Sequence, residues 1–564
     1  MVIILDKKIL QTDLLVIGGG AAGTFAAIKA KQNNNDIETL VIDKGNIERS
    51  GCLASGINAI NAYITENESP YSYLEYVKKD NYNLIRDDLV LSIGKNVNKV
   101  TKTLEKWGLP IKKDKQGNYL ARSSRSIKIK GENIKPILAN KLKEHKVKIM
   151  NRTLALNFII EENTIKGVYA YNITNNIFYK INAEATIIAT GGAAGIYQPN
   201  NMGKARHKMW YPPFNSGSGY AMGIRAGAEM TTFEMRFIAL RVKDVFAPTG
   251  TLAFAGARQV NNLGEEYLNK YDNITTAMRL YATIQEEKEG RGPCFMVFDD
   301  ISKKKKENLY KSFLNMSPDL ILKFEEEYVN DNKIKIPITG SEPFIVGGHA
   351  QAGYWIDVER KTTLNGLYAA GDVAGGAPKK YASGAFVEGK IAAEAAVEYI
   401  KNNRGNKNNN DFTLKDKKQY NNFIKFVKKK ENYYIPEELL LELQFIMEKY
   451  AGGKSKNYEL NEKDLKTAKN KISNLDQKIN NIYAKNKYEL IKTIELVNKI
   501  EVAKVLIEHL LYRQETRWPG YQTRMDYPYK NDDWLKFINS KKDLEKDELI
   551  LKTIDLKNTK EVIV

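Results

Sequence analysis

The fold is decided by residues 12–43, TDLLVIGGGAAGTFAAIKAKQNNNDIETLVID. An apolar run at 14–17 predicts a β-strand, residues 21–31 predict a helix, and residues 40–42 predict a second strand. The glycines between the first strand and the helix have the spacing G-x-G-x-x-G. Together these features predict a βαβ unit that binds a dinucleotide.

Each glycine of that loop has its own expected role. Gly18 permits the tight turn, Gly20 lets the backbone approach a pyrophosphate, and Gly23 lets the helix and the strand pack closely. The start of the helix offers unpaired N–H groups to the anion. Asp43 follows Gly23 by twenty residues, where a carboxylate can accept hydrogen bonds from ribose hydroxyls. A glycine-rich turn that binds no ligand is the alternative explanation.

Length and composition indicate a globular protein of two or three domains. The chain has 564 residues, of which 43% are hydrophobic, and no apolar run is long enough to span a bilayer. The N-terminus continues directly into the first strand without a signal-peptide pattern, which predicts a cytoplasmic protein with no membrane insertion. Its two cysteines, Cys52 and Cys294, are far apart and argue against a disulfide framework, an iron–sulfur cluster or a metal site in this chain.

The formal charge of +19 raises the question of an anionic partner. The lysines are scattered along the chain among many Asn and Ile residues, which is typical of a solvated surface, so no nucleic-acid partner is expected. A non-enzymatic nucleic-acid-binding protein remains a remote alternative, against which a yellow purified protein would count.

The chain divides into an α/β domain, an insertion and a helical C-terminal part. Residues 1–232 and 345–401 share the strand-and-glycine character and form the two parts of one discontinuous domain. The inserted domain is expected at 233–344, and a helical domain with a tail at 402–564. Five residues of the latter, Leu496, Ile500, Ala503, Ile507 and Leu510, follow steps of four and three and predict one apolar helix face.

Three separated pieces resemble the flavoproteins of the fumarate reductase and succinate dehydrogenase superfamily. They are GGGAAG with Asp43, ATGG at 189–192 and GLYAAGDV at 366–373. The resemblance implies a Rossmann-like FAD-binding domain, an inserted α+β capping domain and a C-terminal helical domain. It puts residues 50–57 by the isoalloxazine, and because this segment has no histidine, the FAD is expected to be non-covalent. The implied cofactor-binding residues are Gly18, Gly20, Ala22, Gly23, Asp43, Lys44, Ser50, Gly51, Ser55, Gly56, Thr190, Gly191, Asp372 and Ser383.

Within that superfamily, the sequence is more similar to the α subunit of dissimilatory-type adenylylsulfate reductase. The matching stretches, in chain order, are ERSGCLASGINAINAY, KGENIKPILA, MWYPPFNSGSGYAMGIRAGAEM, EMRFIALRVKDVFAPTG, YASGAFVEG and ETRWPGYQTRMDYPYKNDDWLKF. Fumarate-type enzymes have a histidine where this chain has Ala247, and acidic and glycine neighbours that Arg258 lacks here. A fumarate reductase or succinate dehydrogenase flavoprotein is therefore the alternative, and the role of Arg258 stays open.

The resemblance implies five residues around the substrate. Arg241 and His349 are the expected catalytic residues, because a guanidinium pairs with oxyanions and an imidazole can donate to a developing negative charge. Asn61, Trp210 and Glu132 are expected to bind the substrate. A surface ion pair for Arg241, a loop histidine for His349 and a core indole for Trp210 are the structural alternatives.

The implied reaction needs an electron donor that this chain does not contain. Reduced flavin would attack the sulfur of an adenylyl sulfate through N5, form a flavin–sulfite adduct and expel the nucleotide monophosphate. Without cysteines for clusters, the resemblance implies a ferredoxin-like iron–sulfur β subunit that holds the [4Fe-4S] clusters. A hetero-oligomer such as α2β2 is expected.

Two basic clusters bear on which nucleotide is used. Arg125 belongs to the first, with Arg122, Lys128 and Lys130, and Lys204 and Arg206 belong to the second, with Lys208. A 3′-phosphate adds roughly two negative charges, so these clusters favour 3′-phosphoadenylylsulfate over adenylylsulfate as substrate. Solvated surface lysines and arginines are the alternative explanation.

Overall fold

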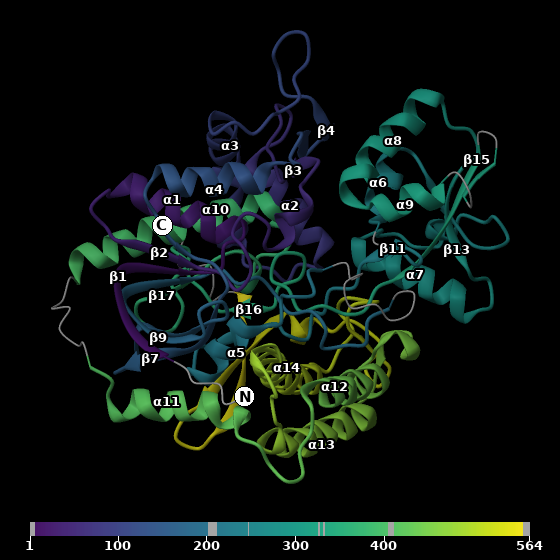
Figure 1. The fold of residues 1–564 in the computed structure, drawn as a ribbon. Coiled ribbons are helices and arrows are strands. Elements are labelled where there is room, and N and C mark those ends of the chain that lie inside the picture. The colour runs from purple at the N-terminus through teal and green to yellow at the C-terminus, as the bar shows by residue number, and fades with distance from the viewer. Residues whose placement is uncertain are drawn as a thin grey trace.

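The computed structural model describes residues 6–200, 211–245, 247–324, 328–330, 333–403 and 411–556. Three parts can be followed in Figure 1: an α/β body, a lobe built from the middle of the chain, and a group of C-terminal helices. This arrangement confirms the predicted fold class. None of the helices in the described ranges has the length and apolar character needed to cross a membrane.

The body is built on a mixed sheet with the strand order β6-β2-β1-β9-β8-β7, and β17 pairs with β9. The predicted βαβ unit is present, because β1 pairs in parallel with β2 and the intervening chain forms α1, Ala21–Asn33. The last three strands along the order form the antiparallel part of the sheet. The strand bounds are β1 Asp6–Ile17, β2 Thr39–Ile42, β6 Lys148–Met150, β7 Thr153–Glu161, β8 Thr164–Asn172, β9 Ile177–Ile188 and β17 Leu367–Ala369.

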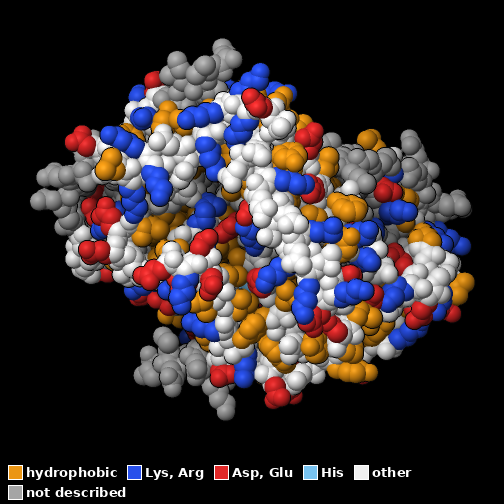
Figure 2. Space-filling view, turned by 90° about the horizontal axis from the view of Figure 1, so that it is seen from below, with side chains coloured by type: hydrophobic (Ala, Val, Ile, Leu, Met, Phe, Trp, Pro, Cys, Tyr) orange, Lys and Arg blue, Asp and Glu red, His pale blue; other side chains and the backbone are white. Residues whose placement is uncertain are grey.

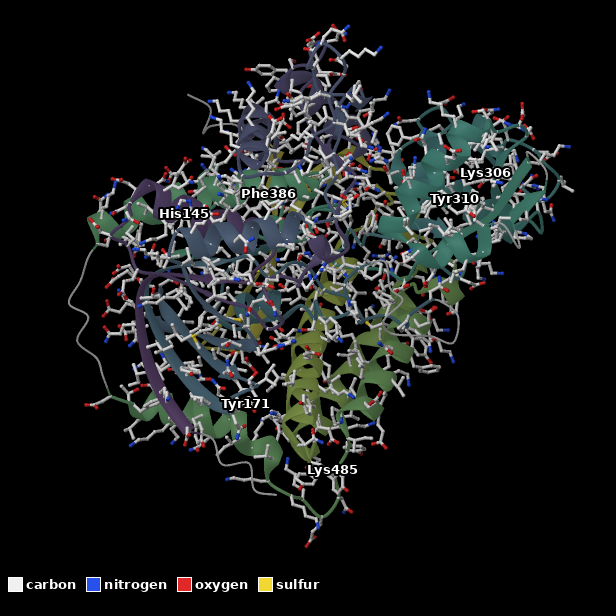
Figure 3. The ribbon with its side chains drawn as sticks, turned by 45° about the horizontal axis from the view of Figure 1, so that its top comes forward. His145, Tyr171, Lys306, Tyr310, Phe386 and Lys485 are labelled. Atoms are coloured by element: carbon white, nitrogen blue, oxygen red, sulfur yellow. The ribbon has the colours of Figure 1, made fainter. Side chains whose placement is uncertain are left out.

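Helices cover this sheet because their buried faces are apolar. Figure 1 shows α1, α4 and α10 together on one side of it. Phe25 of α1 contacts Phe386 of α10 with ring centroids 5.5 Å apart, and Figure 3 shows Phe386 within this helix layer. The helices of this part are α2 Pro70–Asp80, α3 Asp87–Lys106, α4 Ile134–Glu144, α5 Ser218–Arg225 and α10 Tyr381–Asn402, and a small sheet contains β3 Ala59–Asn61, β4 Ala121–Ser123 and β5 Ser126–Lys128.

The lobe in the middle of the chain has its own sheet and its own core. Its strand order is β11-β15-β13-β12, with β14 beside β15. A separate cluster of buried apolar side chains runs from Val242 to Ile338. Figure 3 shows Lys306 and Tyr310 of α8 on this lobe. The elements are β11 Leu240–Val242, α6 Thr249–Phe254, β12 Arg258–Val260, α7 Thr276–Lys288, β13 Cys294–Phe298, α8 Lys303–Met316, α9 Pro318–Lys323, β14 Val329–Asn330 and β15 Lys333–Gly340.

The C-terminal part is helical and then returns to the body as strands. The five residues of the predicted apolar stripe lie on α14 and are all buried. The tail forms β20 and β21, and β20 pairs with β10 of the body, which the sequence had not indicated. The bounds are β10 Met230–Thr231, β16 Gly353–Tyr354, α11 Leu414–Ile424, α12 Pro436–Tyr450, β18 Glu459–Leu460, α13 Glu462–Lys478, α14 Lys487–Tyr512, β19 Thr523–Arg524, β20 Lys536–Asp543 and β21 Glu548–Asp555.

The positive charge is spread over the surface. On the face drawn in Figure 2, lysine and arginine side chains are interspersed with acidic ones. Ion pairs elsewhere, such as Lys141 with Glu144 and Lys478 with Glu442, also place opposite charges next to each other. That face therefore offers no single continuous basic patch for a nucleic acid.

Candidate functional site

A cavity of about 2350 Å³ joins the glycine loop to the lobe. It opens beyond the carboxyl ends of β1 and β2, where open α/β sheets bind their ligands. Its wall continues through residues 50–57 and 189–191 and reaches α6 of the lobe. One cavity thus brings together the three sequence pieces that implied a flavin.

The loop after β1 is shaped by contacts that only glycine allows. Gly18 has a φ of +106°, and a Cβ there would lie 2.4 Å from the carbonyl oxygen of Ala189. A Cβ on Gly23 would lie 1.9 Å from the carbonyl oxygen of Gly18. No atom lies within 4 Å of a Cβ built on Gly20, so this position faces open space in the cavity. The start of α1 is thereby held close to the space that a pyrophosphate would fill.

Asp43 lies at the end of β2 and lines the same cavity. Its Oδ2 accepts hydrogen bonds from the backbone N–H of Gly19 at 2.6 Å and from the hydroxyl of Ser50 at 3.1 Å. Its Oδ1 accepts from the backbone N–H of Gly45 at 2.7 Å. These bonds fix the carboxylate beside the glycine loop, within reach of a dinucleotide ribose.

A second carboxylate, Asp372, lies where the pieces at 189–192 and 366–373 meet. Its Oδ2 accepts from the hydroxyl of Tyr211 at 2.8 Å, and the oxygen of Tyr211 accepts from the backbone N–H of Gly192 at 2.8 Å. A Cβ on Gly348 would lie 1.7 Å from Oδ1 of Asp372. Burial raises the pKa of the Asp372 carboxyl.

Nearly all of the predicted cofactor-binding residues line this cavity. They are Gly18, Gly20, Ala22, Asp43, Lys44, Ser50, Gly51, Gly56, Thr190, Gly191, Asp372 and Ser383. Gly23 supports the loop from behind, and the side chain of Ser55 lies outside the described ones. The small residues along 50–57 leave space for a flat ring, so the cavity fits the group that the motifs imply. Tyr211 was missed because nothing in its local sequence shows that it spans Gly192 and Asp372.

His349 and Asn61 also line the cavity. The His349 ring lies between Phe237, at 4.8 Å, and Tyr381, at 5.5 Å, between ring centroids. Burial, and then the charge of Lys379, lower the pKa of His349 to about 3. The imidazole is therefore neutral near pH 7 and can donate one hydrogen bond without adding charge.

Four cationic side chains line the end of the cavity at the lobe. The Arg122 guanidinium lies 4.7 Å from the ring centroid of Phe254 on α6. Arg279 of α7 donates to Oε1 of Gln259 at 2.9 and 3.1 Å. Arg125 pairs with Glu68 at 3.0 Å, and Lys379 pairs with Asp80 at 2.7 Å. Arg122 and Arg125 belong to the first basic cluster of the sequence, whereas nothing in the sequence pointed to Arg279 and Lys379.

Two predicted residues do not reach the cavity. Arg241 is buried, and its guanidinium donates to the backbone carbonyl of Val245 at 2.9 Å instead of facing the ligand space. Its neighbour Leu240 lines the cavity, and side chains alternate along a strand, so Arg241 points to the other side. Glu132 is exposed just before α4. Their predicted roles in catalysis and substrate binding gain no support from this geometry.

The remaining predicted residues fall into two groups. Trp210, Lys204 and Arg206 lie outside the described residues. Arg258 is largely exposed on β12, where it pairs with Glu266 and Asp299, which agrees with a surface ion pair. The sequence also gave no sign of Lys135, whose ammonium donates to the Gly19 carbonyl and whose pKa burial lowers to about 8.

Comparisons with known proteins agree with an FAD-binding domain. The family model described as FAD binding domain matches residues 13–385, and the one described as fumarate reductase flavoprotein C-term matches residues 441–562. The adenylylsulfate reductase subunit alpha of Megalodesulfovibrio gigas is 28% identical over 95% of this chain and 94% of that protein. The adenylylsulfate reductase structure from Archaeoglobus fulgidus is 32% identical, with a TM-score of 0.91, over 98% of this chain and 96% of that one.

More distant structures show how far the fold extends. The E. coli quinol fumarate reductase flavoprotein is 18% identical, with a TM-score of 0.81, over 98% of this chain and 97% of that chain. This likeness concerns the fold alone.

A structure of adenosine-5-phosphosulfate reductase in complex with sulfite, as a covalent adduct, is 32% identical, with a TM-score of 0.90, over 98% of this chain and 96% of that one.

The fold and the cavity are those of a flavoprotein, an FAD-dependent oxidoreductase with an FAD-binding domain over most of its length. The chain belongs to the adenylylsulfate reductase family, as a relative of its flavoprotein α subunit.

Proposed function

We propose that this chain is the flavoprotein subunit of a reductase that converts an adenylyl sulfate to sulfite and the nucleotide monophosphate. The observation that carries the proposal is the presence of Arg122, Phe254 and Arg279 in the wall of the cavity that also contains the FAD-binding motifs. Arg258, the remnant of the fumarate-type motif, lies outside that wall and is paired on the surface. The cavity therefore favours a nucleotide oxyanion over a dicarboxylate as substrate.

These three residues suit the parts of a nucleotide sulfate. Guanidinium groups bind sulfate and phosphate oxygens through paired, planar hydrogen bonds, which Arg122 and Arg279 can supply. The Phe254 ring is 60% exposed in the cavity wall and offers a surface on which an adenine can stack. The guanidinium over that ring adds a cation–π contact.

Charge stabilisation and exclusion of water are the contributions of the protein to the reaction. FAD, when bound, supplies the two electrons that reduce the sulfur. Negative charge grows on the phosphate of the departing nucleotide, and cations aimed at that position stabilise it most when water is excluded. Neutral His349 can donate one hydrogen bond to a sulfate oxygen while it leaves the net charge of the site unchanged.

The nucleotide is proposed to be 3′-phosphoadenylylsulfate, with adenylylsulfate as the alternative. Arg125 lines the cavity, and Nη1 of its guanidinium donates one hydrogen bond to Glu68. The other N–H groups are suited to an additional phosphate. Lys204 and Arg206 would contribute further charge by the sequence argument.

The electrons are proposed to come from a ferredoxin-like iron–sulfur β subunit, in an assembly such as α2β2 in the cytoplasm. The designation of the Megalodesulfovibrio gigas relative as a subunit alpha supports a second subunit. The [4Fe-4S] clusters would belong to that partner.

The test is turnover of the purified complex with a reduced dye against adenylylsulfate, its 3′-phosphorylated form and fumarate in parallel. Sulfite should form from a nucleotide sulfate, and fumarate should not be reduced. Arg279→Gln should lower sulfite formation roughly a hundredfold or more with FAD still bound. Arg258→Gln is the matched control and should retain wild-type turnover. Fumarate reduction, or a larger loss in Arg258→Gln than in Arg279→Gln, would overturn the proposal.

A further inference from the structure

Three segments that are distant in the sequence meet at the start of α7. Asp80 is the last residue of α2, Lys379 precedes α10, and Thr276 is the first residue of α7. The Lys379 ammonium lies 2.7 Å from a carboxylate oxygen of Asp80 and 2.7 Å from the hydroxyl oxygen of Thr276. The backbone N–H of Thr276 donates to Oδ1 of Asp80 at 3.2 Å. These three residues are called the α7 clasp below.

Lys379 is the buried member of the clasp, whereas Thr276 is exposed. Lys379 is 4% exposed, so its ammonium depends on the two oxygen partners in place of water. Its backbone has a φ of +59°, and Tyr381 has a φ of +53°, a conformation that non-glycine residues rarely adopt. The hydroxyl of Tyr73 donates to the backbone carbonyl of Lys379 at 3.0 Å, which helps to hold this loop. Asp80 also supplies a negative charge at the N-terminus of α7, where the helix dipole makes a negative charge favourable.

The position of α7 decides where Arg279 points. Arg279 follows Thr276 by three residues and therefore lies on the same side of the helix. All three clasp residues and Arg279 line the cavity. A change in the first turn of α7 would consequently move the guanidinium relative to the nucleotide space.

We propose that Asp80 and Lys379 are positioning residues that hold α7, and through it Arg279, in the place needed to bind the anionic part of the substrate. The role rests on the proposed function, since it assumes that Arg279 binds a nucleotide oxyanion. The clasp also keeps the ammonium of Lys379 in the wall beside His349, and that charge opposes protonation of the imidazole. Asp80 compensates the same charge, so the pair orients α7 without adding net charge to the site.

The test is a double-mutant cycle in the FAD-loaded complex with Asp80→Asn, Arg279→Gln and the double variant. Asp80→Asn should raise KM for the nucleotide sulfate at least tenfold and lower kcat much less. It should have little further effect in the Arg279→Gln background, because its action passes through Arg279. Independent, additive effects of the two substitutions would overturn the proposal.

The chain offers a matched control for the same chemical change. Asp87 lies in the first turn of α3 and pairs with Lys78 at 2.7 Å, and neither residue lines the cavity. Asp87→Asn should leave KM unchanged. A comparable rise in KM in Asp87→Asn would show that the effect of Asp80→Asn is a general loss of stability, and would sink the positioning role.

Two further measurements keep the proposal testable if Asp80→Asn folds poorly or if no nucleotide sulfate is reduced. Lys379→Arg keeps the charge and should retain KM better than Lys379→Met. Hydrogen exchange at the amides of residues 276–280, measured in FAD-loaded protein without substrate, should be faster in Lys379→Met than in wild type. Unchanged exchange there would refute the clasp, whereas absent turnover in wild type with faster exchange in the variant would refute the proposed function alone.

Discussion

Replacement of Gly23 or Gly20 by alanine should separate the two roles of the glycine loop, which are helix packing and close approach to the cofactor. In Gly23→Ala the new Cβ would lie 1.9 Å from the Gly18 carbonyl oxygen, whereas ordinary contact begins at 3.4 Å, a deficit of 1.5 Å. Helix α1 cannot retreat, because α10 packs directly behind it. A Cβ on Gly389 of α10 would lie 2.2 Å from the Ala22 carbonyl oxygen, which shows how close the two helices are.

The magnitudes differ for the two substitutions. Overpacking of this kind costs about 1–3 kcal/mol, which for Gly23→Ala should lower the Tm of the FAD-free protein by roughly 1–4 °C. Displacement of the α1 N-terminus from the pyrophosphate would cost up to about 2 kcal/mol more, a rise of roughly 30-fold in the Kd for FAD. The Cβ of Gly20→Ala meets no protein atom, and the φ of −77° suits alanine. That variant should keep its Tm and lose FAD affinity only.

The assay pairs thermal unfolding of the FAD-free protein with a flavin fluorescence titration. Gly23→Ala should lower both the Tm and the affinity for FAD, whereas Gly20→Ala should lower only the affinity for FAD. Equal losses of Tm in the two variants, or a wild-type Tm in Gly23→Ala, would refute the assignment of Gly23 to packing and Gly20 to cofactor approach.

Three further predictions concern the cofactor, His349 and Arg125. Acid precipitation should release the flavin into the supernatant, because residues 50–57 contain no histidine for attachment, and colour that stays in the pellet would contradict this. The pKa of His349 is lowered from 6.5 to about 3, so the unfolded chain takes up the proton first and stability falls as the pH drops below 6.5, by about 1.4 kcal/mol per pH unit. Thermal unfolding at pH 7 and 5 should therefore show that His349→Gln loses less stability between these two pH values than the wild type does. Equal losses of stability would contradict the lowered pKa of His349. Arg125→Gln should weaken turnover of the 3′-phosphorylated nucleotide roughly tenfold more than that of adenylylsulfate, and parallel losses would exclude Arg125 as the site of the extra phosphate.

The cofactor end of the cavity could be predicted because short, continuous segments of sequence determine its geometry. A loop that approaches a phosphate needs glycines at fixed offsets, and the close contacts at Gly18 and Gly23 show the reason. The apolar stripe on α14 was also predictable, since one helix period decides which side chains are buried. In both cases a few neighbouring residues carry the whole signal.

The substrate end could not be predicted in the same way, because it depends on which side of an element faces the cavity. Arg241 and Arg279 are both arginines of the middle segment, but Arg241 lies on a strand whose other side lines the wall, and Arg279 lies one turn into α7. The register of β11 against β15, and the clasp at the start of α7, decide between them. These contacts join residues about 100 or more positions apart. Likewise β20 of the C-terminal tail pairs with β10 near residue 230. Because that partner strand is distant in the sequence, the tail was not predicted to form strands.

The charge of the cavity follows from these pairings more than from the +19 of the whole chain. Lys44 pairs with Glu495, Arg125 with Glu68 and Lys379 with Asp80, so those three cations are largely compensated before any ligand binds. Across the described ranges no carboxylate lies within ion-pair distance of Arg122 or Arg279, and burial lowers the pKa of both guanidinium groups without neutralising them. Two uncompensated guanidinium groups match the two acidic groups of adenylylsulfate, each carrying roughly one negative charge. A 3′-phosphate would bring further negative charge, and the N–H groups of Arg125 that do not bind Glu68 are the ones proposed to meet it.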